Sequence, residues 1–114
     1  MKAQPAAARA LLSAAPLFAA LGDEARLHIV SRLCEAGPLS ISRLAAGASI
    51  SRQAVTKHLH ALSNAGLICG ERCGRERIWR LEPARLTEVR RYLDQISAQW
   101  DAAIERLRAF VERA

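Results

Sequence analysis

Apolar residues recur at intervals of three and four along most of this chain, a pattern that predicts a mainly helical protein. A first helix is expected within residues 1–22 and is expected to pack in a dimer. A second helix is expected from Asp23 to Ala36, because Asp23 suits the positive end of a helix dipole and Gly37-Pro38 ends a helix. Its expected apolar face consists of Leu27, Ile29, Val30 and Leu33.

A short helix and a tight turn follow. Ser40 is the expected N-cap of a helix that ends near Ala46. The apolar face of this helix consists of Ile41, Leu44 and Ala45. The turn is expected at residues 47–50, with Ile50 filling the core between two helices. This spacing predicts a helix-turn-helix over residues 40–66, although many helical hairpins share it.

The second helix of this unit has one apolar side and one polar side. It begins after Ser51, a good N-cap, and no helix breaker interrupts it before Asn64. The inner side consists of Val55, Leu59 and Leu62, with His58 at its edge. The opposite side carries Gln53, Lys57, His60 and Asn64, with Thr56 on its flank. Such amide, ammonium, hydroxyl and imidazole groups can hydrogen-bond base edges and phosphates; an ordinary solvated face is the alternative.

Residues 67–81 predict a β-hairpin rich in arginine. One strand is expected at residues 67–72 and the other at 77–81, with 73–76 at the tip. Between residues 51 and 80, six basic residues outnumber two acids, a net charge of +4 out of the +6 of the chain. After a basic helix, this hairpin is expected to be a wing that binds phosphates; an edge-protected ribbon is the alternative. The residues expected to bind DNA are Ser51, Arg52, Gln53, Thr56, Lys57, His60, Arg72, Arg75 and Arg77.

The last third of the chain predicts one long helix, residues 83–113, with Pro83 in its first turn. Its apolar seam consists of Leu86, Val89, Leu93, Ile96, Trp100, Ala103, Leu107 and Phe110. The seam is about 37 Å long, more than a small domain can cover by itself. We therefore expect a homodimer, and packing within one monomer is the alternative. The expected interface residues are Leu86, Val89, Leu93, Ile96, Trp100 and Leu107.

Composition supports a single domain, residues 1–114, and narrows the classes of function. Hydrophobic residues make up 51% of the chain, which is incompatible with disorder, and aromatic residues only 4%, which argues against a base-stacking single-strand binder. The net charge of +6 suggests an anionic partner such as double-stranded DNA. No phosphate loop, zinc-finger spacing or nucleophile elbow occurs, so we expect neither an enzyme nor a bound cofactor.

The N-terminal segment and the cysteines indicate the cellular compartment of the protein. The alanine-rich start could pass for a signal peptide, but Pro16 interrupts its apolar run. No apolar run reaches the length that spans a membrane, so no membrane partner is expected. The three cysteines, Cys34, Cys69 and Cys73, form no disulfide framework and fit a reducing compartment. We therefore expect a cytoplasmic protein.

Residues 18–100 resemble an ArsR-type winged-helix repressor. The resemblance is carried by Phe18–Val30, Ile50–Leu62, Asn64–Ile68 and Gly74-Arg75. It implies a winged helix-turn-helix with long terminal dimerisation helices, mainly α with a small β-hairpin. It also implies a homodimer that represses transcription from an inverted repeat. The chain departs from the family pattern in the turn, where Ala48 and Ser49 replace a bulky apolar residue followed by glycine.

The signal that this protein would sense is not evident. One metal site of the family uses two cysteines where Ser40 and Ser42 stand here, and hydroxyls are poor ligands for thiophilic metals. The other uses histidine and carboxylates on the last helix, but no histidine follows His60. No metal is therefore expected, and any small-molecule inducer is unknown. Cys69 and Cys73 remain candidates for a redox- or arsenite-responsive pair. A protein–protein assembly module is the alternative to DNA binding.

Overall fold

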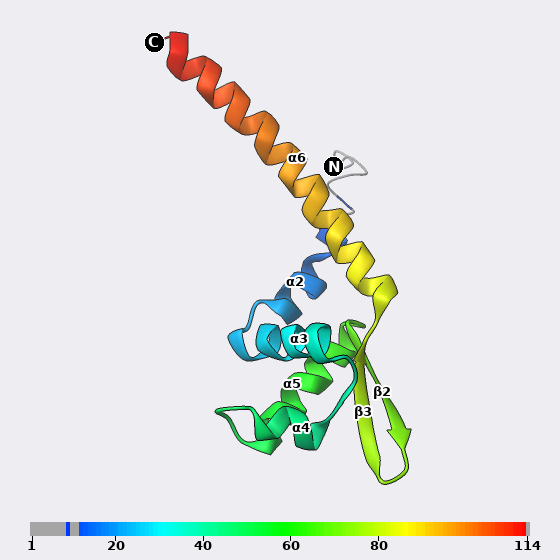
Figure 1. The fold of residues 1–114 in the computed structure, drawn as a ribbon. Coiled ribbons are helices and arrows are strands. Elements are labelled where there is room, and N and C mark those ends of the chain that lie inside the picture. The colour runs from blue at the N-terminus through cyan, green and yellow to red at the C-terminus, as the bar shows by residue number, and fades with distance from the viewer. Residues whose placement is uncertain (1–8, 10–11, 114) are drawn as a thin grey trace.

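The computed structural model describes residues 9 and 12–113 and is mainly helical, with a small antiparallel sheet (Figure 1). In chain order the elements are α2 (Ala15–Leu21), α3 (Glu24–Ala36), β1 (Leu39–Ser40), α4 (Ile41–Ala46), α5 (Arg52–Asn64), β2 (Ile68–Cys73), β3 (Glu76–Leu81) and α6 (Pro83–Arg113). This is the winged helix-turn-helix that the sequence predicts. Of the helix expected within residues 1–22, residues 1–8 and 10–11 lie outside the described part.

The wing has three strands in the order β1-β3-β2, not the two that the sequence predicts. A two-residue turn, Gly74-Arg75, joins β2 to β3, and Gly74 has φ 66°, as a type II′ hairpin turn requires. The added strand β1 pairs Leu39 with Trp79 and Ser40 with Ile78. A two-residue strand leaves no alternation in the sequence, so only its pairing with β3 reveals it.

The burial of side chains agrees with the prediction in α5 but not at one position of α3 or in the turn before α5. The largest fully buried residues are Leu44, Val55, Leu59, Leu62 and Leu67. The expected burial of Leu27 is wrong, since it is 52% exposed. At about 100° per residue, Leu27 lies roughly 120° from Leu33 on α3, whereas Ile29 lies close to Leu33. The expected core position of Ile50 is also wrong, because the residue is 37% exposed at the turn.

Local capping groups fix where the helices begin and end. The side chains of Asp23, Ser40 and Ser51 each accept a hydrogen bond from a backbone amide three residues ahead. All three caps lie where the sequence predicts helix starts. At the end of α5, Gly66 has φ 79° and the Leu67 amide donates to the Leu62 carbonyl, a Schellman motif that leads the chain into β2.

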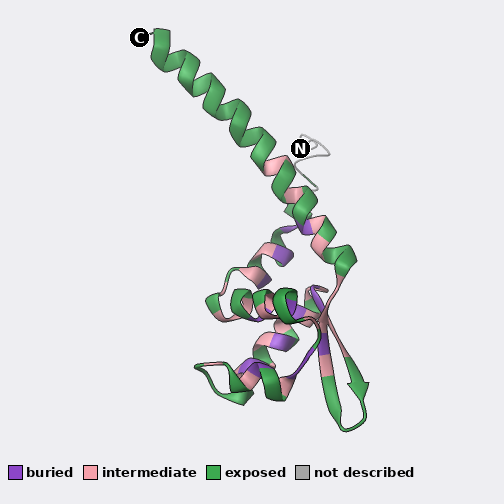
Figure 2. Cartoon of the chain, viewed as in Figure 1, coloured by how far each residue is buried: buried purple, intermediate pink, exposed green. Residues whose placement is uncertain are grey.

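Helix α6 leaves the body of the protein and projects into solvent (Figure 1). The molecule measures 65 × 32 × 22 Å as a result. Val89 is buried near the start of α6, whereas every described residue from Ser97 to Arg113 is exposed (Figure 2). Among the described residues, no helix has both the length and the apolar character needed to cross a membrane.

Candidate DNA interface

The outer face of α5 is a row of exposed polar side chains. Gln53, Lys57, His60 and Asn64 are all exposed, while the opposite residues are buried in the core. Arg52 extends this face at the start of the helix. The face therefore offers amide, ammonium, imidazole and guanidinium groups to a ligand, with no hydrophobic residue among them.

Two hydroxyl groups that were expected on this face from the sequence make hydrogen bonds within α5. The Ser51 hydroxyl accepts from the Ala54 amide at 3.1 Å, and the Thr56 hydroxyl donates to the Arg52 carbonyl at 3.0 Å. The Ser51 hydroxyl keeps its proton for a further acceptor. The Thr56 proton is already committed, so Thr56 can only accept a further hydrogen bond without breaking that contact.

His58 lies on the inner edge of α5, as the helical wheel predicts, and is half-buried. The Arg26 Nε donates to His58 Nδ1 at 3.3 Å, and the Arg26 guanidinium also reaches the Ala20 carbonyl at 3.4 Å. Arg26 therefore ties α5 to α2 and α3 through one side chain. This contact holds the inner side of the helix whose outer side carries the exposed polar row.

The wing arginines divide between the two faces of the hairpin. Arg72 and Arg77 are paired across β2 and β3, so two like charges lie side by side and exposed. Arg75 is exposed in the turn at the tip. On the other face, Arg80 lies 3.0 Å from Glu71, and this hydrogen-bonded partner raises the pKa of the Arg80 guanidinium. The exposed guanidinium groups of Arg72, Arg75 and Arg77 thus remain available for an anion. The charge of Arg80 is balanced by its ion pair with Glu71.

Trp79 connects the wing to α5. It is 4% exposed, its ring centroid lies 6.4 Å from that of His60, and the Arg77 guanidinium carbon lies 5.2 Å above its ring. Gly70 makes this possible: a Cβ there would come within 2.6 Å of Arg77 Nε and 3.0 Å of the Trp79 ring. Neither Trp79 nor Gly70 was predicted from the sequence as part of the site. The signal was present in the alternation of Arg77, Trp79 and Leu81 along one face of β3.

The cysteines are free thiols, and Cys69 and Cys73 lie on one face of β2. Cys69 is half-buried opposite Arg80, and Cys73 is exposed opposite Glu76, next to the wing tip. In the described part of the chain, no three histidine, cysteine or carboxylate side chains come together as metal ligands would.

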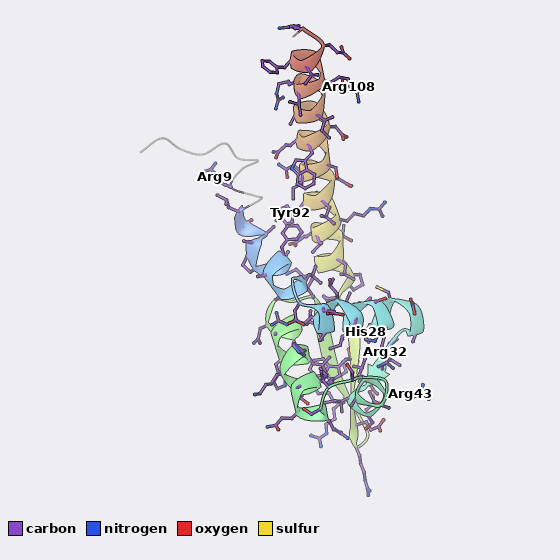
Figure 3. The ribbon with its side chains drawn as sticks, turned by 90° about the vertical axis from the view of Figure 1, so that its left-hand side faces the viewer. Arg9, His28, Arg32, Arg43, Tyr92 and Arg108 are labelled. Carbon is purple, nitrogen blue, oxygen red and sulfur yellow. The ribbon has the colours of Figure 1, made fainter. Side chains whose placement is uncertain are left out.

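The apolar stripe of α6 has no cover within the described part of the chain. Of the residues expected at a dimer interface, Leu86, Val89 and Ile96 are buried or half-buried near the body. The other three are exposed: Leu93 by 49%, Trp100 by 67% and Leu107 by 62%. Tyr92 lies on the side of α6 that faces α2 (Figure 3), where it packs on the edge of the core.

Comparisons with known proteins agree on one family. The HTH-type transcriptional regulator Rv2034 of Mycobacterium tuberculosis is 39% identical over 85 residues, 75% of this chain and 76% of that protein. A structure of an ArsR-like transcriptional regulator from Rhodococcus sp. RHA1 superposes with a TM-score of 0.70 at 38% identity, covering 90% of this chain and 92% of that one. The chain belongs to the ArsR family of winged helix-turn-helix transcriptional regulators. It is therefore a DNA-binding regulator and not an enzyme.

Other comparisons give further proteins that this ArsR-family chain resembles. A family model described as a helix-turn-helix domain matches residues 21–69. The arsenical resistance operon repressor of Escherichia coli is 30% identical over 83% of this chain and 79% of that protein. The solution structure of a homodimeric winged helix-turn-helix domain, Mb0332 from Mycobacterium bovis, superposes with a TM-score of 0.62 at 27% identity, covering 87% of this chain and 91% of that one.

Proposed function

We propose that this ArsR-family protein is a homodimeric repressor that binds an inverted-repeat operator in the cytoplasm. The observation that carries the proposal is the chain of contacts from the exposed His60 through the buried Trp79 to the exposed Arg77. It joins the exposed face of α5 to the exposed arginines of the wing. A helix in the major groove braced by a wing on the backbone needs the two elements to be held side by side in this way.

Within these two elements we assign base contacts to α5 and phosphate contacts mainly to the wing. The amide of Gln53 can pair with adenine in the major groove, and His60 can reach a neighbouring base edge. Lys57, Arg72 and Arg75 are cations without carboxylate partners in the described part of the chain, which suits them to phosphates. Arg52 and the Ser51 hydroxyl lie at the start of α5, where a phosphate would also meet the helix dipole.

The dimer follows from the uncovered stripe on α6. Trp100 and Leu107 are among the most exposed large apolar side chains of the chain, and an identical helix from a second copy would cover them. A two-fold axis places two copies of α5 on one side, so the operator should be roughly palindromic. The homodimeric state of the Mycobacterium bovis relative and the repressor role of the Escherichia coli relative support this proposal.

The test begins with selection of bound fragments from random duplex DNA. We expect an enriched inverted repeat; absence of enrichment would favour a protein–protein assembly module instead. The double variant Lys57→Ala/Arg75→Ala should weaken binding to all sequences and lower the salt slope by about two units, one per phosphate contact. Gln53→Ala should mainly relax base preference, by about 1–3 kcal/mol at one position.

Arg80→Ala is the matched control, because Arg80 is paired with Glu71 on the other face of the hairpin. It should leave the salt slope unchanged in anisotropy titrations at several salt concentrations. If the double variant binds as tightly as the wild type, the assigned face is wrong.

A thiol response is a second candidate, favoured by the exposed Cys73 next to the wing tip. Peroxide can oxidise a thiol to a sulfinate, whose negative charge would be repelled by nearby phosphates. We propose to measure operator affinity with and without peroxide and arsenite, on the wild type and on Cys69→Ser/Cys73→Ser. Release in the wild type alone supports the thiol response, and equal behaviour of both proteins contradicts it.

A further inference from the structure

A pocket of about 530 Å³ lies between α3, the turn of the helix-turn-helix and the first turns of α5. Ile29, Leu44 and Val55, from three different helices, lie behind it and are at most 5% exposed. The accessible apolar lining is Ile50, which is 37% exposed, with the half-buried Ala48. The mouth of the pocket carries ionisable groups from α3 and its N-cap. This volume is within the range of sites that hold small organic molecules. The pocket lies on the side of α5 away from the exposed polar row, so it is separate from the proposed DNA-binding face.

The turn between α4 and α5 explains why the pocket is open. Ala48 and Ser49 line it with small side chains, and Ile50 stands at its edge, 37% exposed, without filling the space. At Gly47 an added Cβ would come within 3.1 Å of the Arg32 guanidinium, so the end of α4 cannot carry a side chain there without displacing Arg32. The hollow therefore comes from this turn sequence.

The charges at the mouth favour a cation. Asp23 and Glu24 both line the pocket, and among its described lining residues Arg32 is the only lysine or arginine. The Arg32 guanidinium donates to the carbonyls of Leu44 at 2.8 Å and Arg43 at 3.0 Å, so its donors are directed at the end of α4. Figure 3 shows His28 and Arg32 on α3, with Arg43 close to Arg32.

Glu24 is the carboxylate free to bind a ligand. Its side chain makes no hydrogen bond or ion pair within the described part of the chain, and it is exposed at the start of α3. His28 follows it by four residues, on the same side of the helix, and also lines the pocket. Asp23 is already engaged as the cap of α3, where it accepts from the Arg26 amide at 3.1 Å. These side chains lack the grouping of three ligands that a metal needs.

We propose that this pocket binds a small organic amine, with its apolar body against Ala48 and Ile50 and its ammonium group at Glu24. Because Ala48, Ser49 and Ile50 belong to the turn that precedes α5, the ligand contacts the segment that leads into the helix proposed to read DNA. Occupancy and operator binding are therefore coupled, and by linkage each changes the affinity of the other by the same factor. The coupling rests on the proposed function; the pocket does not.

Binding is tested on the full chain without DNA, by two-dimensional amide NMR. The probes are benzylamine, benzyl alcohol and benzoate, which share one ring and differ in charge. We expect benzylamine to bind most tightly, at a roughly millimolar dissociation constant, and to shift the amides of residues 24–28 and 47–50. Equal affinity for the three probes, preference for benzoate, or shifts elsewhere would overturn the site.

Two variants locate the ligand. Glu24→Gln should weaken benzylamine at least about threefold and leave benzyl alcohol unchanged, because only the amine loses a charged partner. Glu35→Gln, on the far end of the same helix and outside the pocket, is the matched control and should change neither. Ala48→Leu should fill the hollow and abolish the shifts. If Ala48→Leu does not fold, the comparison of Glu24→Gln with Glu35→Gln still decides.

Coupling is tested with the DNA fragment selected in the absence of any probe. Saturating benzylamine at constant ionic strength should change operator affinity at least about threefold in the wild type and not in Ala48→Leu. Unchanged affinity in a wild type that binds both probe and DNA would overturn the coupling. Failure to select any DNA would count against the proposed function and leave the NMR result on the pocket standing.

Discussion

Gly70 shows how the absence of one side chain makes room for the contacts of Trp79 in the wing. It lies opposite Trp79 in the sheet, and its missing side chain leaves the space that the Trp79 ring and the Arg77 side chain occupy. We expect Gly70→Ala to push Arg77 off the ring, because the added Cβ would lie 2.6 Å from Arg77 Nε. The free energy of unfolding should fall by about 1 kcal/mol, since the Trp79 ring must also shift slightly to accommodate the methyl group.

The informative readout for Gly70→Ala is DNA binding and not stability alone. If Arg77 contacts a phosphate, its displacement should lower the salt slope by about one unit. Gly22→Ala is the control for an added methyl group far from the wing, because its Cβ would lie 3.3 Å from the Phe18 carbonyl oxygen and 3.5 Å from that of Ala19, a milder approach than the 2.6 Å at Gly70. A variant with unchanged salt slope would show that the Trp79 stack does not position Arg77 for DNA.

Asp23 should make stability depend on acid. A hydrogen bond from the Arg26 amide, with the nearby His58 and Arg26 side chains, holds the pKa of the Asp23 carboxyl below its ordinary value of 3.8. Because the pKa is lower in the folded protein, the Asp23 carboxylate stabilises the fold fully above its ordinary pKa. This contribution is lost as the pH falls from the ordinary pKa through the lower pKa of the folded state. The stability difference between the wild type and Asp23→Asn should therefore shrink below about pH 3.8.

The measurement is urea unfolding of both proteins from neutral pH down to about pH 2.5. Asp101→Asn, at an exposed position of α6, serves as the control for removing one carboxylate. A difference that stays constant across the acid range would mean that the charge of Asp23 does not matter to the fold.

At the scale of elements, the short helix α4 depends on a side chain from α3. Arg32 donates hydrogen bonds to two carbonyls in the last turn of α4, those of Leu44 and Arg43. It thus supplies hydrogen-bond donors that a six-residue helix cannot supply to its own last carbonyls. Arg32→Ala should destabilise the protein by about 1–3 kcal/mol, because hydrogen bonds to charged groups are the stronger ones. Urea midpoints give the value.

Arg43→Ala is the matched control for that variant. The Arg43 side chain is exposed, and only its backbone carbonyl meets Arg32. Its replacement should change stability by less than about 0.5 kcal/mol. Equal losses in the two variants would show that general charge, and not the cap on α4, explains the effect.

At the scale of the whole molecule, α6 carries the assembly. Trp100→Asp, or truncation after Ile96, should yield a monomer or an insoluble chain without tight operator binding. A Trp side chain buried in a dimer contributes about 3–5 kcal/mol, and a buried carboxylate adds a desolvation cost. Sedimentation of the purified variants measures the outcome.

Ala102→Asp is the control for assembly, because Ala102 is exposed on the opposite side of α6 from Trp100. It should remain dimeric. A folded Trp100→Asp protein that sediments as the wild type does would exclude this stripe as the interface.

The sequence alone determined the helices, the caps at Ser40 and Ser51, the buried side of α5 and the hairpin, because these depend on neighbours a few residues away. Tertiary structure decided what joins distant segments. The strand at Leu39–Ser40 exists only through its pairing with β3, and the buried Trp79 ring occupies space that the missing side chain of Gly70 leaves. Ile50 lies exposed at the edge of a pocket and not in the core, because its place relative to α3 and α5 depends on packing between helices, which no local pattern encodes.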